Sequence, residues 1–330
     1  MSSLYKELQY DRVISRVQGV QFSVLSESEV LARSVCEVII PRTFEGNDPI
    51  TDGLFDPRMG VVDGRRLCVT CHQRNTFCPG HFGHVRLARP CFYIQFYDIL
   101  KKLMGCICYR CSKLLVDETS PEVRAMLTSR RAGSSSNQRR WDVVTKQCAR
   151  VKRCGAVSQD GCGARRPDSI IKAEDMQMRL VWKATNTEEA REIMLSAEDV
   201  LRIMRRVTDA DCAMIGLDPK FVRPESLVCS VLPIPPPAVR PSVRHESGQR
   251  QEDDLTHKLS EIVKTNNMIR EKIDKGASAD VVEKLGLVLQ YHVSTLIDNK
   301  SSLYPSKDRA GRVLRTLVER LGHKEGRIRE

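Results

Sequence analysis

The chain has 330 residues, which is long enough for about two domains. Lys and Arg number 53 against 42 Asp and Glu, so the net charge is +11. Such an excess indicates an anionic partner, most often nucleic acid, although a solvated basic surface gives the same balance. No stretch resembles a signal peptide or approaches the ~18 continuous apolar residues of a membrane helix, so we expect no membrane partner.

The first hundred residues predict short strands, then a loop, then a helix. Residues 20–24 and 35–40 alternate between apolar and polar side chains, as strands do. Residues 42–66 are rich in glycine and proline and predict a loop. Residues 90–104 carry apolar side chains at helical spacing and predict a short buried helix.

Between the loop and this helix lies the tight pattern Cys68-x2-Cys71-x6-Cys78-x2-His81. Zinc prefers four soft or borderline ligands at tetrahedral corners, and each of the two short turns supplies one pair. Because four protein ligands leave no open coordination position, the pattern predicts a structural zinc site and not a catalytic one. His84 is then a spare histidine.

A second cysteine set begins with Cys108-x2-Cys111 and must be closed by residues further along the chain. Cys162 lies between two glycines, as in a metal knuckle. Cys148 and Cys154 compete for the fourth place, and we favour Cys148. The second predicted zinc site therefore consists of Cys108, Cys111, Cys148 and Cys162.

The chain holds 13 cysteines, and the ones outside these two sets are expected in the core. Because Cys-x2-Cys pairs occur without a secretion signal, we expect reduced thiolates on metal and no disulfides. The compartment would then be the cytosol, the nucleus or a viral factory. An arginine-rich polar stretch, residues 129–140, predicts a mobile surface loop.

The second half of the chain is predicted to be mostly helical. Ser196 is placed to cap a helix that continues to Val207. Five prolines between Val231 and Pro241 predict a stiff extended connector that separates two halves. Two amphipathic helices follow within residues 254–298, and the short break between them predicts an antiparallel pair that approximates a coiled coil.

The tail, residues 300–330, holds nine Lys and Arg against four Asp and Glu. Lys324, Arg327 and Arg329 surround Gly326, a composition that suits a loop in contact with phosphate groups. No His-Glu-x-x-His sequence, phosphate-binding glycine loop or aspartate-rich cluster is present. We therefore expect no catalytic residue in the chain itself.

Five motifs resemble, in order, the N-terminal part of the largest subunit of eukaryotic RNA polymerase II. The first is Cys68 to His84, preceded by Gly53-Leu-Phe-Asp-Pro-Arg-Met-Gly60. Related polymerases of large DNA viruses share several of these motifs, so a viral origin stays open. The other four motifs are Cys106–Leu115, Val231–Ser242, Gln249–Leu259 and Lys324–Arg329.

By this resemblance the chain is an α+β protein whose zinc-stabilised clamp core and head, with short strands and helices, precede an antiparallel helical hairpin. It would be part of a DNA-directed RNA polymerase, a nucleotidyltransferase. The implied parts are a clamp core with the first zinc site at 1–104, a clamp head with the second at 105–230, a connector and lid-like loop at 231–253, the clamp coiled coil at 254–298, and a rudder-like loop with the start of the switch region at 299–330.

The resemblance also implies partners. These are template DNA, the RNA–DNA hybrid, the second-largest and smaller polymerase subunits, and initiation and elongation factors at the coiled coil. The compartment would be the nucleus, or a viral factory or the cytoplasm for a viral chain. The family's Asn-Ala-Asp-Phe-Asp-Gly-Asp motif is absent, so catalytic Mg2+ would bind outside this chain. The alternatives are a free-standing zinc-stabilised nucleic-acid-binding module and, less favoured, a zinc enzyme.

Overall fold

The computed structural model describes most of the chain as a mixed helix-and-sheet protein, which confirms the α+β class. Part of the expected strand at 20–24 and of the lid-like loop lies outside the described residues. These residues are 18–19, 23–116, 121–128, 134–156, 161–173, 176–186, 188–244, 250–300, 302, 304–308, 310–322 and 326.

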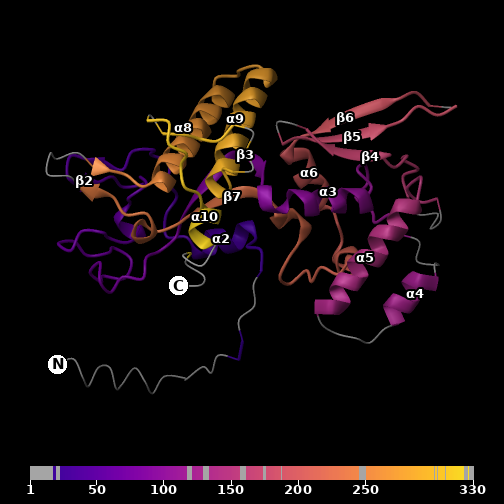
Figure 1. The fold of residues 1–330 in the computed structure, drawn as a ribbon, viewed down its shortest axis with the longest axis horizontal. Coiled ribbons are helices and arrows are strands. Elements are labelled where there is room, and N and C mark those ends of the chain that lie inside the picture. The colour runs from indigo at the N-terminus through magenta and orange to yellow at the C-terminus, as the bar shows by residue number, and fades with distance from the viewer. Residues whose placement is uncertain are drawn as a thin grey trace.

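The described elements form two lobes that meet at strands β3 and β7 (Figure 1). Four small antiparallel sheets are present among these residues, with strand orders β1-β2, β3-β7, β4-β5-β6 and β8-β9. In chain order the elements are α2 (Glu27–Arg33), β1 (Phe44–Glu45), β2 (Asp48–Pro49), η1 (Pro57–Met59), β3 (Gly83–Phe92), η2 (Ile94–Phe96), α3 (Tyr97–Cys106), α4 (Pro121–Thr128), α5 (Ser134–Arg150), β4 (Ser169–Lys172), β5 (Met178–Trp182), β6 (Arg191–Leu195), α6 (Ala197–Arg205), α7 (Asp209–Ile215), η3 (Pro224–Leu227), β7 (Val228–Ile234), η4 (Pro237–Val239), β8 (Val243–Arg244), β9 (Arg250–Gln251), α8 (Asp254–Asp274), α9 (Ala279–Ile297) and α10 (Leu317–Leu321).

The pair β3 and β7 contributes to both hydrophobic cores. Gly83 lies opposite Ile234 at one end of the antiparallel ladder, and Phe92 lies opposite Val228 at the other. Phe92 and Val228 pack in a core with α3, α5, α6 and β5, whereas the other end packs with α8 and α9. The ladder therefore joins the two lobes through shared buried side chains.

The proline-rich segment begins as a strand and not as a free connector. Pro233 belongs to β7 and lies opposite His84, a position that a proline tolerates because β7 has one strand neighbour within the described chain. Further on, the fully buried Arg240 donates from Nε to the carbonyl oxygen of Pro235 at 3.0 Å and from Nη1 to Thr256 Oγ1 at 3.3 Å. These bonds attach the segment to the start of α8.

Helices α8 and α9 lie side by side, joined by residues 275–278 (Figure 1). Their packing buries an apolar stripe from each helix. Knobs-into-holes packing of a coiled coil stays a prediction. The stripe consists of Leu255, Leu259, Ile262, Val263 and Ile269 from α8 and Leu289, Val293 and Leu296 from α9.

Two side-chain amides of these helices complete an irregular part of β3. The register of β3 against β7 shifts between Arg86 and Cys91, which leaves backbone groups without ladder partners. Asn266 of α8 accepts from Ala88 N at 2.7 Å and donates to the carbonyl oxygen of Arg86 at 2.9 Å. Gln290 of α9 accepts from Phe92 N at 2.6 Å and donates to the carbonyl oxygen of Phe92 at 2.9 Å.

Residues 134–140 are helical, which corrects the expectation of a mobile loop there. They belong to α5, and residues 129–133 lie outside the described part of the chain. Val144 and Cys148 are fully buried, and Trp141 packs against the same core, so one face of α5 is apolar at helical spacing. The expected helix after Ser196 is confirmed, because Ser196 Oγ accepts from Asp199 N at 3.2 Å and Asp199 Oδ2 accepts from Ser196 N at 3.2 Å.

A buried polar cluster joins α8 and α9 to the segment that follows them. Lys258, only 2% exposed, donates to Ser306 Oγ at 2.9 Å and to His292 Nδ1 at 3.3 Å. Burial lowers the pKa of Lys258 to about 8. Burial, together with the charge of Lys258, lowers the pKa of His292 from 6.5 to about 4, while Glu261 opposes this shift.

We predict that His292 makes the fold less stable in mild acid. Unfolded chain binds a proton at His292 below about pH 6.5, whereas the folded protein resists that proton until about pH 4. Stability contributed by neutral His292 is therefore present above pH 6.5 and is lost as the pH falls toward 4. Urea unfolding across this range should show a steeper loss for the unmodified chain than for His292→Gln. A difference between the two proteins that does not change with pH would contradict this assignment, since both carry the same cysteines.

Candidate metal centres

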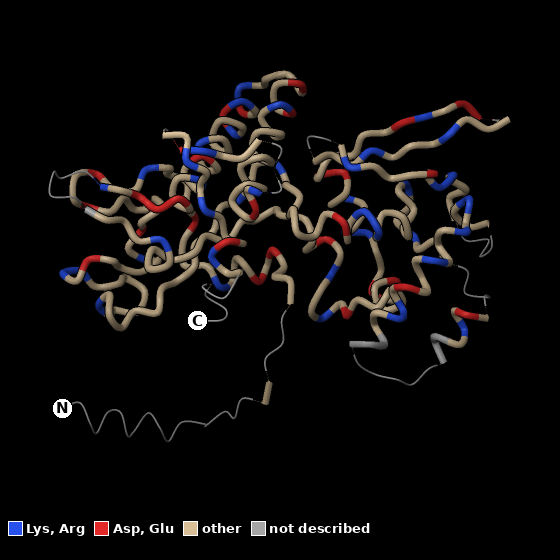
Figure 2. Tube along the Cα trace, in the orientation of Figure 1, with Lys and Arg blue, Asp and Glu red and all other residues tan. Residues whose placement is uncertain are grey.

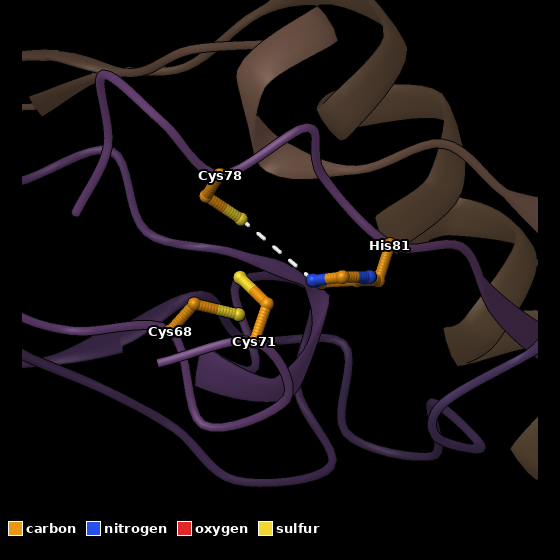
Figure 3. A group of neighbouring side chains, drawn as sticks. All are labelled: Cys68, Cys71, Cys78 and His81. Carbon is orange, nitrogen blue, oxygen red and sulfur yellow. Dashed lines mark hydrogen bonds between the residues drawn. The ribbon is translucent and has the colours of Figure 1, made fainter. Parts of the chain in front are cut away.

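The first cysteine set converges in space, as its spacing predicts. Cys68, Cys71, Cys78 and His81 turn their side chains toward one another from the loop between η1 and β3 (Figure 3). Their four candidate ligand atoms all lie within 4.8 Å of one another, and Cys78 Sγ is 3.7 Å from His81 Nε2.

Two turns with the same local structure carry the two Cys-x2-Cys pairs. In the first, Cys68 N donates to the carbonyl oxygen of Gln73 at 2.9 Å, and His72 N donates to that of Cys68 at 2.8 Å. In the second, Cys108 N donates to Lys113 and Ser112 N to Cys108, both at 2.9 Å. His72 and Ser112 occupy the left-handed region, with φ of 56° and 65°. This uncommon conformation directs both thiols of each pair to one point.

The second group consists of Cys108, Cys111, Cys154 and Cys162. Their sulfur atoms also lie within 4.8 Å of one another. Cys108 Sγ is 3.5 Å from Cys162 Sγ, and Cys111 Sγ is 3.5 Å from Cys154 Sγ. The turn of Cys154 and Cys162 closes through Gly163 N, which donates to the carbonyl oxygen of Cys154 at 3.1 Å.

The structure corrects the fourth member of this group from Cys148 to Cys154. Cys148 lies on the buried face of α5, next to the Cys106 thiol, which together with burial raises the pKa of Cys148 well above its ordinary value. The sequence did hold a signal for the correct choice. Cys154 and Cys162 are each followed by a glycine with positive φ, 76° at Gly155 and 69° at Gly163, whereas an alanine follows Cys148.

Both groups fit zinc by the chemistry and spacing of their donors. With zinc–sulfur bonds of about 2.3 Å, tetrahedral geometry separates two ligand sulfurs by roughly 3.8 Å. The sulfur–sulfur distances of 3.5 Å are near this value and far too long for a disulfide bond. When bound, zinc would crosslink the loops through four protein ligands at each group, and the two groups could therefore hold two structural ions.

The thiols differ in how readily they ionise. The hydrogen bond with His81 lowers the pKa of Cys71 to about 7. Burial opposes ionisation of Cys111, but the N–H of Lys113 and the thiol of Cys154 lower its pKa to about 7. Metal binding favours the thiolate form, so each group already contains one thiol that is close to that state at neutral pH.

The expected nucleic-acid contacts cannot be placed in the same way. Lys324, Arg327 and Arg329 lie outside the described residues, and their contacts with phosphate stay a prediction. No described helix combines the length and the apolar composition that crossing a membrane requires.

Comparison with known proteins places this chain among polymerase sequences. Residues 14–330 match the family described as RNA polymerase Rpb1, domain 1. The DNA-directed RNA polymerase subunit Rpo1N of Methanocaldococcus jannaschii is 38% identical over 317 residues, which cover 94% of this chain and 22% of that protein. The subunit of the same name from Methanothermobacter thermautotrophicus is 34% identical over 319 residues, covering 96% of this chain and 35% of that protein. The chain thus spans well under half the length of these relatives.

Two alanine variants distinguish a metal ligand from a packed thiol. Cys154→Ala should reduce the zinc content of the purified chain from about two ions to about one, because three thiols remain at the second group. Cys148→Ala is the matched control, since it removes a buried thiol from the same region and should leave both ions in place. Elemental analysis of the reduced proteins provides the measurement. Loss of zinc from the Cys148 variant and not from the Cys154 variant would restore the original assignment.

Proposed function

The chain belongs to the family of RNA polymerase Rpb1, domain 1, and from this premise we propose that it forms the clamp of a DNA-directed RNA polymerase. It is an N-terminal portion of the largest subunit, because family and relatives both match there over nearly its whole length. In the assembled enzyme this clamp would hold template DNA and the RNA–DNA hybrid during transcription. The family match over residues 14–330 is the observation that carries the proposal.

The roles that we propose for the parts of the chain follow from the motifs that resemble the polymerase family. Residues 1–104 and 105–230 would form the clamp core and head, each stiffened by one structural zinc ion. The lid-like loop would project from the paired strands β8 and β9. Helices α8 and α9 would offer a docking surface to initiation and elongation factors, and residues 299–330 would form the rudder-like loop and the start of the switch region.

Synthesis of RNA would take place outside this chain. Catalytic residues are not in this region, and the aspartate-rich motif that holds Mg2+ in the family is absent from the sequence. The parent activity is therefore nucleotidyl transfer by the whole polymerase, assembled with the second-largest and smaller subunits. A free-standing nucleic-acid-binding module is not favoured, since both relatives are named as polymerase subunits.

The two relatives support a polymerase subunit in general, and not the eukaryotic class that the motifs suggested. Both are archaeal proteins, so membership of the eukaryotic polymerase II class stays a prediction from the motifs. The nuclear compartment, or a viral factory or the cytoplasm for a viral chain, likewise stays a prediction.

The charge distribution supports binding of nucleic acid through particular segments of the chain. Figure 2 shows Lys and Arg mixed with Asp and Glu along the described trace in both lobes. The tail, residues 300–330, carries a local excess of five positive charges. Lys and Arg side chains attract phosphate groups without recognising the base sequence, and this attraction weakens as the salt concentration rises.

Replacement of two arginines in the tail tests whether the tail binds template phosphates. In the polymerase assembled with this subunit, Arg327→Ala with Arg329→Ala should weaken template binding at every sequence. The slope of log affinity against log salt concentration should become shallower by about 0.7 to 0.9 for each phosphate that an arginine no longer neutralises. The charge-matched control is Arg150→Ala with Lys183→Ala, two exposed residues of the other lobe. An unchanged slope in the tail variant would contradict the assignment of the tail to template phosphates.

A further inference from the structure

Tyr304 is exposed to an extent unusual for an aromatic side chain. Its relative exposure of 80% exceeds that of every other large hydrophobic side chain in the described part of the chain. Tyrosine normally buries most of its ring, so a ring held in solvent has no role in packing the fold. The ring is therefore accessible to a partner outside this fold.

The backbone beneath this ring is held firmly. Tyr291 Oη of α9 donates to the carbonyl oxygen of Tyr304 at 2.9 Å, and Ser302 Oγ donates to the same oxygen at 3.1 Å. Pro305 follows directly and restricts the backbone further. The ring is thus presented from a constrained position, which reduces the entropy that a binding partner must overcome.

The segment that carries Tyr304 is also attached to the helices below it. Ser306 Oγ accepts from the buried Lys258 at 2.9 Å, and Ser306 N donates to Asn299 Oδ1 at 2.7 Å. Asn299 Nδ2 donates to the carbonyl oxygens of Ser306 at 2.9 Å and Leu314 at 3.2 Å. A cross-strand bridge between Lys307 and Val313 closes the loop. These hydrogen bonds attach Ser306 and Leu314 to Asn299 and to Lys258 of α8.

The charged groups near Tyr304 favour an anionic partner. Two nearby carboxylates are paired within the protein: Asp308 of the loop with Arg312 at 3.0 Å, and Glu319 of α10 with Lys300 at 3.1 Å. Lys307 and Arg315 are exposed, and no side-chain partner is found for them among the described residues. Lys307 and Arg315 lie close to Tyr304 along the backbone, because Leu314 N donates to the carbonyl oxygen of Ser306 at 3.1 Å. An exposed aromatic ring and exposed cations on one loop form the composition that binds single-stranded nucleic acid.

We propose that Tyr304 is a stacking platform for an unpaired nucleic-acid base, with Lys307 and Arg315 in contact with the adjoining phosphates. The base must be unpaired, because bases inside a duplex already stack on their neighbours. This inference deepens the proposed function and rests on it, since it places one base contact within the rudder-like loop. A protein partner is the less suitable occupant, because Lys307 and Arg315, two exposed cations on this loop, complement phosphate groups.

The test uses the polymerase assembled with this subunit and a nucleic-acid scaffold that contains a single-stranded segment. Tyr304→Leu keeps an apolar side chain but removes the aromatic face, and it should weaken binding of the scaffold by about 10-fold. Tyr304→Phe and Tyr304→Trp keep a ring and should bind within about 2-fold of the unmodified enzyme. Because the side chain is 80% exposed, all three variants should fold and assemble normally.

A second measurement locates the contact. Scaffolds with 5-iodouracil at successive single-stranded positions should, after irradiation, crosslink to Tyr304 at one or two adjacent positions. Equal binding by the leucine, phenylalanine and tryptophan variants, with no crosslink at Tyr304, would overturn this inference while leaving the salt-sensitive grip of the clamp intact. Loss of another subunit from the leucine variant would also overturn it, since the ring would then be a protein contact. If the unmodified enzyme itself binds the scaffold without salt dependence, the proposed function fails, and this inference fails with it.

Discussion

The antiparallel pairing of β3 with β7 is the constraint on which the rest of the structure depends. It joins residues 83–92 to residues 228–234, and both hydrophobic cores include side chains from its two strands. The strand β3 begins two residues after His81, and α3 ends two residues before Cys108. One strand and one helix therefore determine where the two candidate metal groups lie relative to each other. Asn266 and Gln290 preserve this arrangement, because Asn266 completes hydrogen bonds of β3 where its register shifts and Gln290 does so at the last residue of the strand.

The first metal group lies in a loop that has little hydrophobic core of its own, so the bound metal would have to stabilise this loop. Around the four ligands, Leu67 is 55% exposed, Val69 55% and Phe77 76%, so apolar burial contributes little to the fold of this segment. A crosslink through four ligands supplies the missing stabilisation, as in other small metal-dependent units. The second group is different, since Cys108 and Cys154 belong to a large core and the ion would reinforce packing that already exists. The two ions would thus contribute unequally to the stability of the protein.

Local patterns in the sequence predicted those parts of the site whose residues are close along the chain. The set from Cys68 to His81 lies within one loop, and the Ser196 cap needs only its own helix, so both were correct. The second group spans Cys108 to Cys162, and the choice between Cys148 and Cys154 depended on which one a helix would bury. The helical face of α5 was missed because its apolar residues are few among many polar ones. The strand character around Pro233 was missed because proline excludes only a central strand, and β7 has one neighbour among the described strands. Side-chain bridges such as that of Gln290 leave no pattern in a sequence.

Zinc held by thiolates would form the rigid points of the proposed clamp, and the proposed function depends on them. X-ray absorption at the zinc edge, measured on the chain purified under reducing conditions, tests this claim most directly. Seven thiols and one imidazole make up the two groups, so the shell should be dominated by sulfur at about 2.3 Å with a minor nitrogen contribution. A shell of oxygen and nitrogen atoms with little sulfur, or folded protein that contains no zinc at all, would contradict the claim.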